Sequence, residues 1–338
     1  MDGYAVNAWG SPAPEPYLLE RQAFGRGPKG SALRKGHAVP ISTGDPLPRG
    51  ANAVVRVEAA RVEDGRLYVA TGVRRGQDVV PRGEFLARGS LLLDRGQQVT
   101  PYHLSALIAE GRSEARVHDP RVAILPIGSE LRGAKGSREG GTPDSIGPVV
   151  RALLHFARPT LLPAVADEPE TVRRAIHDAI PRCELLFTIG GASRGNRDAT
   201  KRVLERMGTL LFEGVTVNVL KQGGVALVSG RPVVVLPGQI TSALTVFHEH
   251  GLHVLSRLVG EELRIFENVE LGEEVTVHHR MDSTVLFRRI GGRIHPLPWG
   301  VAHGPALLAA EGFAVLRRGR TYHAGERIRW MRFLMNSQ

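Results

Sequence analysis

The pattern of apolar and polar residues differs between regions of the chain. In residues 1–102 the runs are brief and alternate with polar residues, as in residues 53–57 and 67–69, and Gly, Pro and Asp separate them. Alternation with a period of two residues is typical of strands that bury one face, and turn-forming residues end each strand. This pattern predicts a small β-rich domain.

A single helix is predicted at the end of this region. Leu104, Leu107 and Ile108 recur at helical spacing, so we expect them to lie on one face of a helix that spans residues 101–111. Gly111 stops the helix because glycine is a poor helix former and suits the position after the last turn.

Strands and helices alternate from residue 121 onward. The apolar runs that predict strands are residues 122–125, 161–165, 185–189, 214–219, 225–229 and 232–236. The segments that predict helices are residues 144–154, 168–180, 199–207 and 241–258. Such alternation favours a mostly parallel sheet with helices on both faces, and ligands bind to such sheets at the carboxyl ends of the strands.

Short alternating strands return from residue 264, and Gly291-Gly292 predicts a tight hairpin turn. We therefore expect a multidomain α/β protein, in which a central, mostly parallel α/β domain is flanked by β-rich N-terminal and C-terminal domains. The expected domains are residues 1–118, which end in a helix, residues 119–262 and residues 263–338.

The composition is that of a globular protein. Hydrophobic residues make up 42% of the 338 residues, and no segment approaches the roughly 20 apolar residues of a membrane span. Residues 1–20 lack the basic start and apolar run of a secretory signal. A single cysteine, Cys183, excludes an internal disulfide and a cysteine-based zinc cluster. We expect a soluble protein of the cytoplasm.

The net charge of +10 and the pI near 10.4 raise the hypothesis of nucleic-acid binding. The basic residues are spread along the chain, however, and their densest cluster, residues 317–320, contains no aromatic residue. Aromatic residues make up only 5% of the chain, which leaves few rings to stack on bases. We therefore favour a solvated surface that attracts small anions, with neither nucleic acid nor a membrane as partner.

The most informative segment is ELLFTIGGASRGNRD, residues 184–198. An apolar run ends in Gly190 and Gly191, a small polar loop follows, and Asp198 opens a helical pattern. A glycine turn lets backbone N–H groups approach an anion, and a helix N-terminus adds partial positive charge. The segment therefore predicts a phosphate-bearing ligand.

The same segment also fits the G-x-S-x-G pattern of hydrolases, with Ser193 as the nucleophile. In those enzymes the helix begins directly after the serine, whereas residues 194–197 intervene here. We therefore interpret Ser193 as a loop residue that donates a hydrogen bond to a phosphate.

Carboxylates are predicted on the loops at the strand ends, at Glu130, Asp144 and Asp198. Carboxylates beside an anion site commonly hold Mg²⁺, which shields phosphate oxygens. Asp144 and Asp198 have a second interpretation as helix N-caps, which does not cover Glu130. A histidine-rich stretch, residues 248–253, lacks the spacing of a zinc motif, and we interpret it as a solvated helix face.

Together these segments resemble the MoeA family, the molybdopterin molybdenumtransferases, which also occur as the E domain of gephyrin. The resemblance follows the family's order along nearly the whole chain. The segments are MDGYAV (1–6), ISTGDPLPRGANAVVRVE (41–58), VRRGQDV (73–79), RVAILPIGSEL (121–131), PDSIGPVVRALL (143–154), TIGGASRGNRD (188–198), VVVLPGQITSALTVF (233–247) and GPALLAAEGFAVLRRGRTYHAGERI (304–328).

The resemblance implies a fold and a reaction. The fold has a molybdopterin-binding α/β domain between β-rich domains, in an elongated homodimer whose active site combines both subunits. The reaction takes adenylated molybdopterin and the substrate molybdate, cleaves the adenylate with Mg²⁺ as cofactor, and releases molybdenum cofactor and AMP.

The resemblance also implies roles for particular residues. Glu130 and Asp198 match acidic catalytic positions linked to the metal. The matching substrate-binding positions are Gly128, Ser129, Gly190, Gly191, Ser193, Gly195, Pro237 and Gly238. The positions that one subunit lends to the site of the other match Asp2, Thr43 and Gly44.

Several positions depart from the family pattern. Ser129 stands in place of an aspartate, Gln239-Ile240 in place of Asn-Pro, and Gly224 in place of the second lysine of Lys-Pro-Gly-Lys-Pro. These changes motivate a second hypothesis, a non-catalytic molybdopterin-binding paralogue that acts as a sensor or carrier. A serine hydrolase that uses Ser193 is the third.

Overall fold

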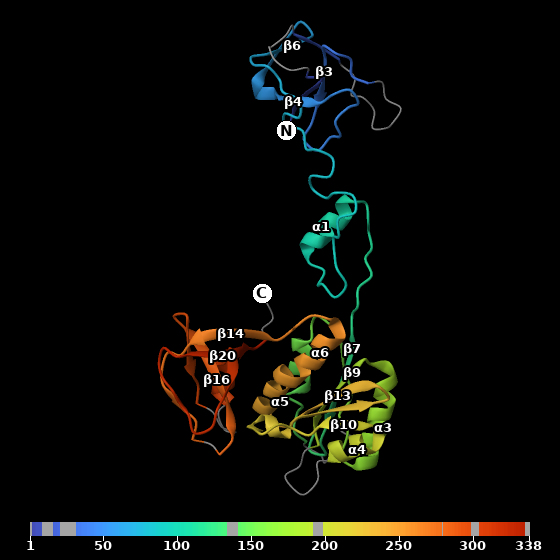
Figure 1. Cartoon of the computed structure of the whole chain (residues 1–338). Helices are drawn as coiled ribbons and strands as arrows, with labels where there is room; N and C mark the ends of the chain where they lie inside the picture. Colours follow the sequence, from blue (N-terminus) through green and yellow to red (C-terminus); the bar gives the residue numbers. More distant parts are fainter. Residues whose placement is uncertain are drawn as a thin grey trace. The chain divides into compact units, whose positions relative to one another are not determined.

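The computed structural model describes residues 2–8, 16–20, 32–133, 141–191, 199–278, 280–298 and 304–334. Two compact units divide the chain, Met1–Leu92 and Leu93–Gln338 (Figure 1). The second unit contains both the central α/β sheet and the C-terminal sheet.

The first unit is built on a six-stranded sheet with the strand order β4-β1-β3-β2-β6-β5. Its strands are β1 (Gly3–Val6), β2 (Tyr17–Leu19), β3 (His37–Ile41), β4 (Ala53–Arg56), β5 (Ala60–Glu63) and β6 (Arg66–Val69). Small and β-branched residues such as Ala5 and Val39 are buried. Gly3 allows β1 to approach β4 closely, because a side chain there would collide with the carbonyl oxygen of Val55.

Helix α1 (Pro101–Ala109) forms where the pattern predicts a helix, and Thr100 caps it. The apolar residues of this helix differ in burial. Leu107 is buried, whereas Leu104 and Ile108 are 50% and 69% exposed. Tyr102 on the same helix is 86% exposed, so α1 presents a partly apolar surface to solvent.

The central sheet has the strand order β10-β12-β13-β9-β7-β8. Its strands are β7 (Arg121–Ile127), β8 (Arg158–Leu161), β9 (Leu185–Gly190), β10 (Thr209–Phe212), β12 (Gly224–Val228) and β13 (Arg231–Leu236). Strands β8, β7, β9 and β13 are parallel, whereas β12 is antiparallel to both β13 and β10. The predicted mostly parallel sheet is confirmed.

Two strand predictions for this sheet are wrong. The run 161–165 is not a strand, since β8 ends at Leu161. Pro163 follows, and proline has no N–H to donate to a ladder. The run 214–219 contains only the short β11 (Val217–Asn218), because Gly214 has a φ of +68° and turns the chain after β10.

Helices cover both faces of this sheet (Figure 1). One face packs against α2 (Gly147–Leu153), α5 (Ile240–Val246) and α6 (Leu252–Val259), and the other against α3 (Pro169–Ala179) and α4 (Ala199–Met207). Strand β9 is buried along its whole length, as expected for a strand between two helical layers.

The predicted long helix contains a π-helical turn, Phe247–Gly251, between α5 and α6. Within this turn His248 is buried, so the predicted solvated histidine face is wrong there. The His248 Nδ1 lies 2.7 Å from the Leu244 carbonyl, and its Nε2 accepts a hydrogen bond from the Leu334 N–H at 3.0 Å. Burial lowers the pKa of His248 to about 4, and burial likewise lowers the pKa of His250 to about 4.

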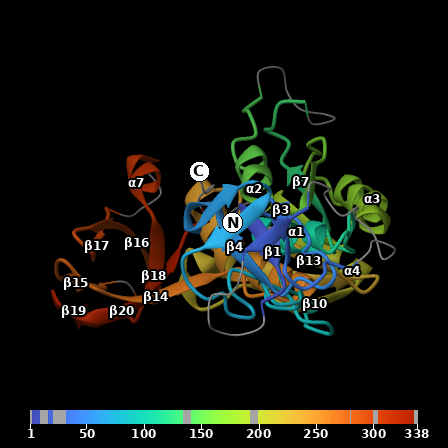
Figure 2. The same ribbon diagram turned by 90° about the horizontal axis from the view of Figure 1, so that it is seen from above.

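The C-terminal sheet has the strand order β11-β16-β18-β20-β14, with β17 paired to β16. Its longer strands are β14 (Ile265–Glu270), β16 (Asp282–Ile290), β17 (Arg293–Pro296), β18 (Gly312–Leu316) and β20 (Arg327–Arg332), and β15 (Val275–Thr276) pairs separately with β19 (Thr321–Tyr322). The predicted hairpin at Gly291 and Gly292 is confirmed, with φ angles of +57° and +82°. Helix α7 (Gly304–Ala309) lies near β16 (Figure 2).

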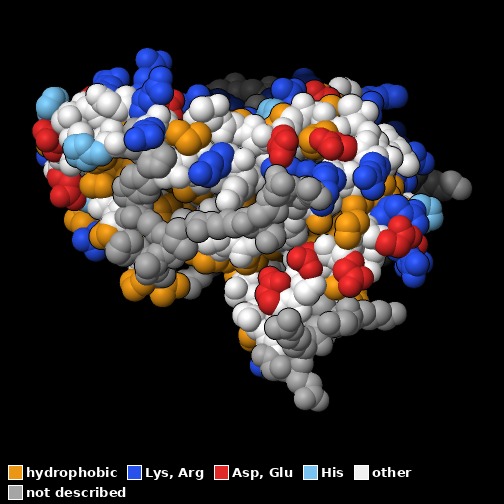
Figure 3. All heavy atoms as spheres, turned by 90° about the horizontal axis from the view of Figure 1, so that it is seen from below, with side chains coloured by type: hydrophobic (Ala, Val, Ile, Leu, Met, Phe, Trp, Pro, Cys, Tyr) orange, Lys and Arg blue, Asp and Glu red, His pale blue; other side chains and the backbone are white. Residues whose placement is uncertain are grey.

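In the described part of the chain, no helix is long and apolar enough to cross a membrane. On the face shown in Figure 3, Lys and Arg side chains are scattered among Asp and Glu side chains. On this face the positive charges do not form one concentrated patch.

Candidate functional site

Strands β7, β9 and β13 end at one level of the central sheet. Ile127 on β7 pairs with Gly190 on β9, and Leu236 on β13 pairs with Ile189. The loops that follow, which carry most of the predicted substrate-binding residues, therefore start side by side at the carboxyl edge, where sheets of this class bind ligands.

Glycines keep this edge free of side chains. Gly190 and Gly191 have φ angles of +85° and +76°. A side chain on Gly190 would collide with the Ile127 carbonyl oxygen, and one on Gly191 would collide with the Thr200 hydroxyl. A Cβ on Gly238 would lie 3.6 Å from the Gly190 Cα, so the main chains of two loops approach each other here. The edge thus presents main-chain atoms to a ligand.

Helix α4 starts directly beside the glycine turn. The Ala199 N–H donates to the Gly191 carbonyl at 3.2 Å, and the buried Thr200 Oγ1 donates to the Gly190 carbonyl at 3.4 Å. The positive end of the helix dipole is therefore fixed at the end of β9, where it favours an anion. The predicted residues Ser193, Gly195 and Asp198 lie outside the described residues.

The loop after β7 brings Ser129 and Glu130 to the same edge. The Gly128 N–H donates to the Val165 carbonyl at 2.9 Å, which ties this loop to the segment after β8. Glu130 is exposed, and its carboxylate has no hydrogen-bond or ion-pair partner among the described residues. A Cβ on Gly128 would lie 2.6 Å from Glu130 Oε1, so this carboxylate folds back over the end of β7.

Asp167 is a site residue that the sequence pattern did not reveal. The Ser129 hydroxyl donates a hydrogen bond to its carboxylate. Ser129 stands where the family pattern has an aspartate, so the structure places a carboxylate from the neighbouring loop next to that position. Sequence spacing could not show this pairing, because it joins two loops that follow different strands.

Two side chains near this edge, those of Asp144 and Gln239, satisfy N–H groups at the starts of helices. The Asp144 Oδ1 accepts hydrogen bonds from the N–H groups of Ile146 and Gly147 at 3.0 and 2.9 Å, so Asp144 satisfies two N–H groups at the start of α2, although the N-cap position itself is Ile146. Gln239 caps α5, since its Oε1 accepts from the Ser242 N–H at 2.7 Å. Gln239 stands where the family pattern has an asparagine, and it still caps the helix that follows the buried Pro237.

The first unit brings together the residues predicted to complete a second subunit's site. The Thr43 N–H donates to Asp2 Oδ1 at 2.6 Å, since β1 pairs with β3 and their neighbouring residues meet. This backbone hydrogen bond lowers the pKa of the Asp2 carboxyl, which is therefore ionised at neutral pH. Gly44 follows with a φ of +90°, which turns the chain directly after Thr43.

Family models match both units of the chain. Residues 1–111 match the model described as MoeA N-terminal region (domain I and II). Residues 123–257 match the model described as Probable molybdopterin binding domain. The chain belongs to the MoeA family.

Relatives within the MoeA family show the extent of the similarity. The molybdopterin molybdenumtransferase of Nostoc sp. is 30% identical over 274 residues, which are 77% of this chain and 63% of that protein. The enzyme of the same name from Haemophilus influenzae is 27% identical over 267 residues, 78% of this chain and 66% of that protein. The chain thus spans slightly less than two thirds of the length of these relatives.

A solved structure of a MoeA protein shares the fold. The molybdopterin biosynthesis MoeA protein from Pyrococcus horikoshii superposes with a TM-score of 0.78 at 23% identity, covering 98% of this chain and 86% of that chain. The predicted fold class, a central molybdopterin-binding α/β domain flanked by β-rich regions, is therefore confirmed.

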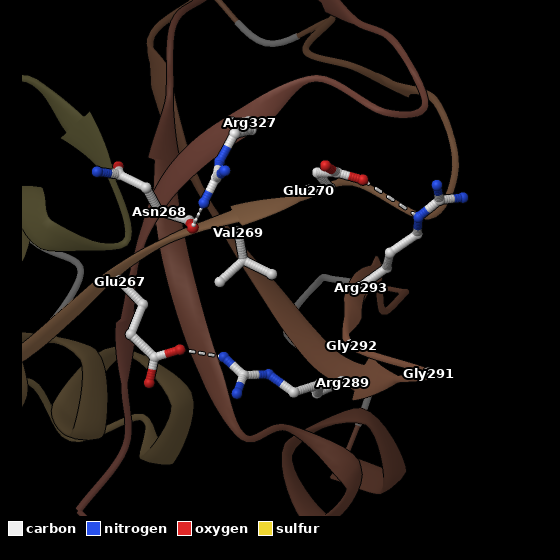
Figure 4. A pocket seen from close by; sticks show the side chains of 9 residues that line it. All are labelled: Glu267, Asn268, Val269, Glu270, Arg289, Gly291, Gly292, Arg293 and Arg327. Carbon is white, nitrogen blue, oxygen red and sulfur yellow. Dashed lines mark hydrogen bonds and ion pairs between the residues drawn. The ribbon is translucent and has the colours of Figure 1, made fainter.

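A hollow of about 390 Å³ lies on the C-terminal sheet (Figure 4). It is lined by Glu267, Asn268, Val269, Glu270, Arg289, Gly291, Gly292, Arg293 and Arg327. Its charges pair with one another, since Arg289 binds Glu267 and the Arg293 Nε lies 3.4 Å from a Glu270 carboxylate oxygen. None of the predicted catalytic, substrate-binding or partner-subunit residues lines it. We interpret it as a gap in the sheet that ion pairs bridge.

Proposed function

We propose that the protein inserts molybdate into adenylated molybdopterin in the cytoplasm, with Mg²⁺-dependent cleavage of the adenylate and release of AMP. One observation carries this proposal. At the carboxyl edge of the sheet, Gly190, Gly191 and Gly238 expose the main chain, and the Glu130 carboxylate has no partner in the part of the chain that the structure describes. The names of the relatives, molybdopterin molybdenumtransferase, support it.

The edge suits a ligand that carries phosphate groups. Backbone N–H groups at a glycine turn and the start of α4 act as fixed dipoles, so they stabilise negative charge without reorganising. The phosphoanhydride of an adenylated pterin and a molybdate dianion repel each other. Aligned dipoles and cations are therefore needed to hold them within reacting distance.

The carboxylates suit Mg²⁺, which prefers oxygen ligands. Among the described residues, no group of at least three His, Cys, Asp or Glu side chains could hold a metal. Mg²⁺ is commonly held by only one or two carboxylates, with substrate phosphates and water completing its shell. Glu130 and Asp198 would hold the ion. When bound, it neutralises phosphoryl oxygens and stabilises the departing AMP.

Ser129 and Asp167 lie at the same edge, and we do not assign them as Mg²⁺ ligands. Their hydrogen bond joins the loop after β7 to the segment after β8, and it fixes the main chain immediately before Glu130. We propose that this link orients the Glu130 carboxylate. The substitution of serine for aspartate is then compatible with turnover.

We further propose that the protein works as a homodimer, in which each subunit lends Asp2, Thr43 and Gly44 to the site of the other. The support is the preformed contact between Asp2 and Thr43 and the exposed apolar side chains of Tyr102 and Ile108 on α1. Exposed apolar surface of this kind is common where a subunit interface forms. Sedimentation of the purified chain at about twice the monomer mass would agree with this part of the proposal, and a monomer at micromolar concentration would contradict it.

The reaction is tested directly with purified protein, adenylated molybdopterin, molybdate and Mg²⁺. We expect AMP release that needs both molybdate and Mg²⁺. No AMP above the buffer control would contradict the proposal. Ligand binding by calorimetry without AMP release would instead favour the sensor or carrier.

A further inference from the structure

Val219 has a backbone conformation that a β-branched residue rarely adopts. Its φ and ψ angles are +76° and −47°, in the region of the strained form of the γ-turn. The other described non-glycine residues with a positive φ are Asp64, Asp78 and Ser229, and none of them is β-branched. Such strain persists only where the surrounding structure fixes the chain firmly.

On the N-terminal side of Val219, the chain belongs to the C-terminal sheet. Strand β11 pairs in parallel with β16, so that Asn218 lies opposite Ser283. The buried Thr284 Oγ1 donates a hydrogen bond to the Asn218 carbonyl at 3.3 Å. The Asn218 Oδ1 in turn accepts from the Val219 N–H at 3.0 Å. The residues directly before Val219 are therefore fixed to β16.

On the C-terminal side of Val219, the chain belongs to the central sheet. Leu220 is buried in the core that the sheet forms with α2, α5 and α6. It opens the short 3-10 helix Leu220–Gln222. A Cβ on Gly214 would lie 2.1 Å from the Lys221 carbonyl oxygen, so the start of this connection packs against its end. Val219 alone thus separates the strand in the C-terminal sheet from the core of the central sheet.

The connection that contains Val219 lies at the carboxyl edge of the central sheet. It joins β10 to β12, and β10 runs parallel to β13 because each is antiparallel to β12. Gly224, the first residue of β12, lies opposite Val235 near the end of β13. Lys221 in this connection is exposed and has no ion-pair partner among the described residues, so the connection brings a cation to the edge.

We propose that Val219 is a positioning residue, and that the C-terminal sheet, through β11 and Val219, holds the residues before β12 in place for the ligand at the carboxyl edge. This inference rests on the proposed function for the identity of the ligand. A strained residue between two anchors cannot relax unless one anchor moves, so the connection stays rigid. A rigid connection loses little conformational entropy when a ligand binds. The C-terminal sheet then contributes to binding although the ligand binds to the central sheet.

The first test releases the strain. Val219→Gly adopts the same φ without strain, but it frees the connection because glycine has the widest choice of backbone conformations. We expect molybdopterin affinity, measured by titration calorimetry, to fall about tenfold. Hydrogen exchange in residues 217–223 should become faster. Ser229→Gly is the matched control and should keep the affinity, because Ser229 also has a positive φ, +50°, but is exposed in the turn between β12 and β13 at the opposite edge.

The second test loosens the connection from the C-terminal sheet. Thr284→Val removes the hydroxyl that binds the Asn218 carbonyl, and we expect molybdopterin affinity to fall about threefold. Thr284→Ser keeps a hydroxyl and should keep the affinity. Ser283→Ala is the matched control, since the Ser283 Oγ donates to the Met281 carbonyl beside its own strand at 3.2 Å. The Thr284 variants keep the test informative even where Val219→Gly folds poorly.

A purely structural hinge would behave differently. It would change the thermal midpoint in Val219→Gly and Thr284→Val but leave both with the molybdopterin affinity of the wild type. That result would overturn the proposal. Equal loss of affinity in Val219→Gly and Ser229→Gly, or in Thr284→Val and Ser283→Ala, would overturn it as well.

The AMP-release assay separates the two proposals. Wild-type protein that binds molybdopterin more tightly than Val219→Gly but releases no AMP would support the role of Val219 and contradict the proposed reaction. AMP release by wild type, with equal molybdopterin affinity in wild type and Val219→Gly, would do the reverse. Wild-type protein that does not bind molybdopterin would overturn both.

Discussion

Two regions of the molecule gather polar groups, and they differ in what those groups face. At the carboxyl edge of the central sheet, Glu130 has no partner among the described residues, and Gly190 and Gly191 leave the main chain bare. In the hollow of the C-terminal sheet, Glu267 and Glu270 each pair with an arginine. Groups that already satisfy one another stabilise a fold, whereas groups without an internal partner are available to a ligand. Concave shape alone would therefore point to the wrong region.

The largest effect is expected from a side chain on the glycine turn. Gly191→Ala would collide with the Thr200 hydroxyl and would need an L-residue at a φ of +76°. We expect molybdopterin binding to fall at least about 100-fold, because the turn must move away from the ligand. Calorimetry measures the affinity.

Gly319→Ala is the control for strain alone. Gly319 also has a positive φ, +66°, but no atom lies within 4 Å of its added Cβ. This variant should lose about 1–2 kcal/mol of stability and keep its affinity. Equal loss of affinity in both variants would break the contrast between the two regions.

Glu130→Gln should remove turnover while the fold stays intact. The amide keeps the shape of the side chain but lacks the charge that Mg²⁺ binding requires, so we expect AMP release to fall about 100-fold or more. Thermal unfolding should be unchanged, since the carboxylate is exposed. Glu205→Gln, at an exposed position of α4, should behave as wild type in both measurements. Full activity in Glu130→Gln would refute the role of this carboxylate.

A substitution in the hollow of the C-terminal sheet should lower stability and leave ligand affinity unchanged. Arg289→Met removes the ion pair with Glu267 and the stacking of the guanidinium over the Trp330 ring, 5.2 Å from its centroid. We expect a loss of about 1 kcal/mol of stability, since both charged side chains are partly exposed. Denaturant unfolding measures this loss. Molybdopterin affinity should not change, and a weaker affinity would mean that the hollow is part of the binding site.

The smallest effect concerns two histidines of the packed helix between α5 and α6, His248, which is buried, and His250, which is half-buried. His248 and His250 have folded pKa values lowered to about 4, while unfolded histidine titrates near 6.5. Between these values the unfolded chain binds more protons, so the free energy of unfolding should fall as the pH drops from about 6.5 to 4. His248→Asn should make this dependence shallower, as measured by thermal unfolding at pH 7 and pH 5. His177→Asn, on the exposed side of α3, should leave it unchanged; an identical slope in His248→Asn and wild type would contradict the assignment.

Much of the central domain could be predicted from the spacing of apolar residues. The strand before Gly190 and the helix 199–207 are where the pattern placed them, because period and burial agree in these segments. Two strand predictions failed because a proline or a glycine in the apolar run does not allow a continuous strand. Pro163 ended one predicted strand and Gly214 bent another.

The site was predictable where its residues are consecutive or match a family motif. The glycine turn follows from its motif, and the family resemblance assigned Asp2 and Thr43 to one site. The pairing of β1 with β3, which brings these two residues into contact, was not predicted. Asp167 was missed because its partner Ser129 lies on another loop, and the buried His248 was missed because a π turn changes which side of the helix faces the core. Contacts between loops depend on how the strands are ordered in the sheet, and apolar periodicity does not contain that order.

The most direct test of the central claim is a crystal structure of the protein with molybdopterin bound. We predict that the phosphate of the pterin contacts the main chain at Gly190 and Gly191, with Glu130 on the same side of the sheet. A ligand bound elsewhere, above all one seated among Arg289, Arg293 and Arg327, would contradict the account.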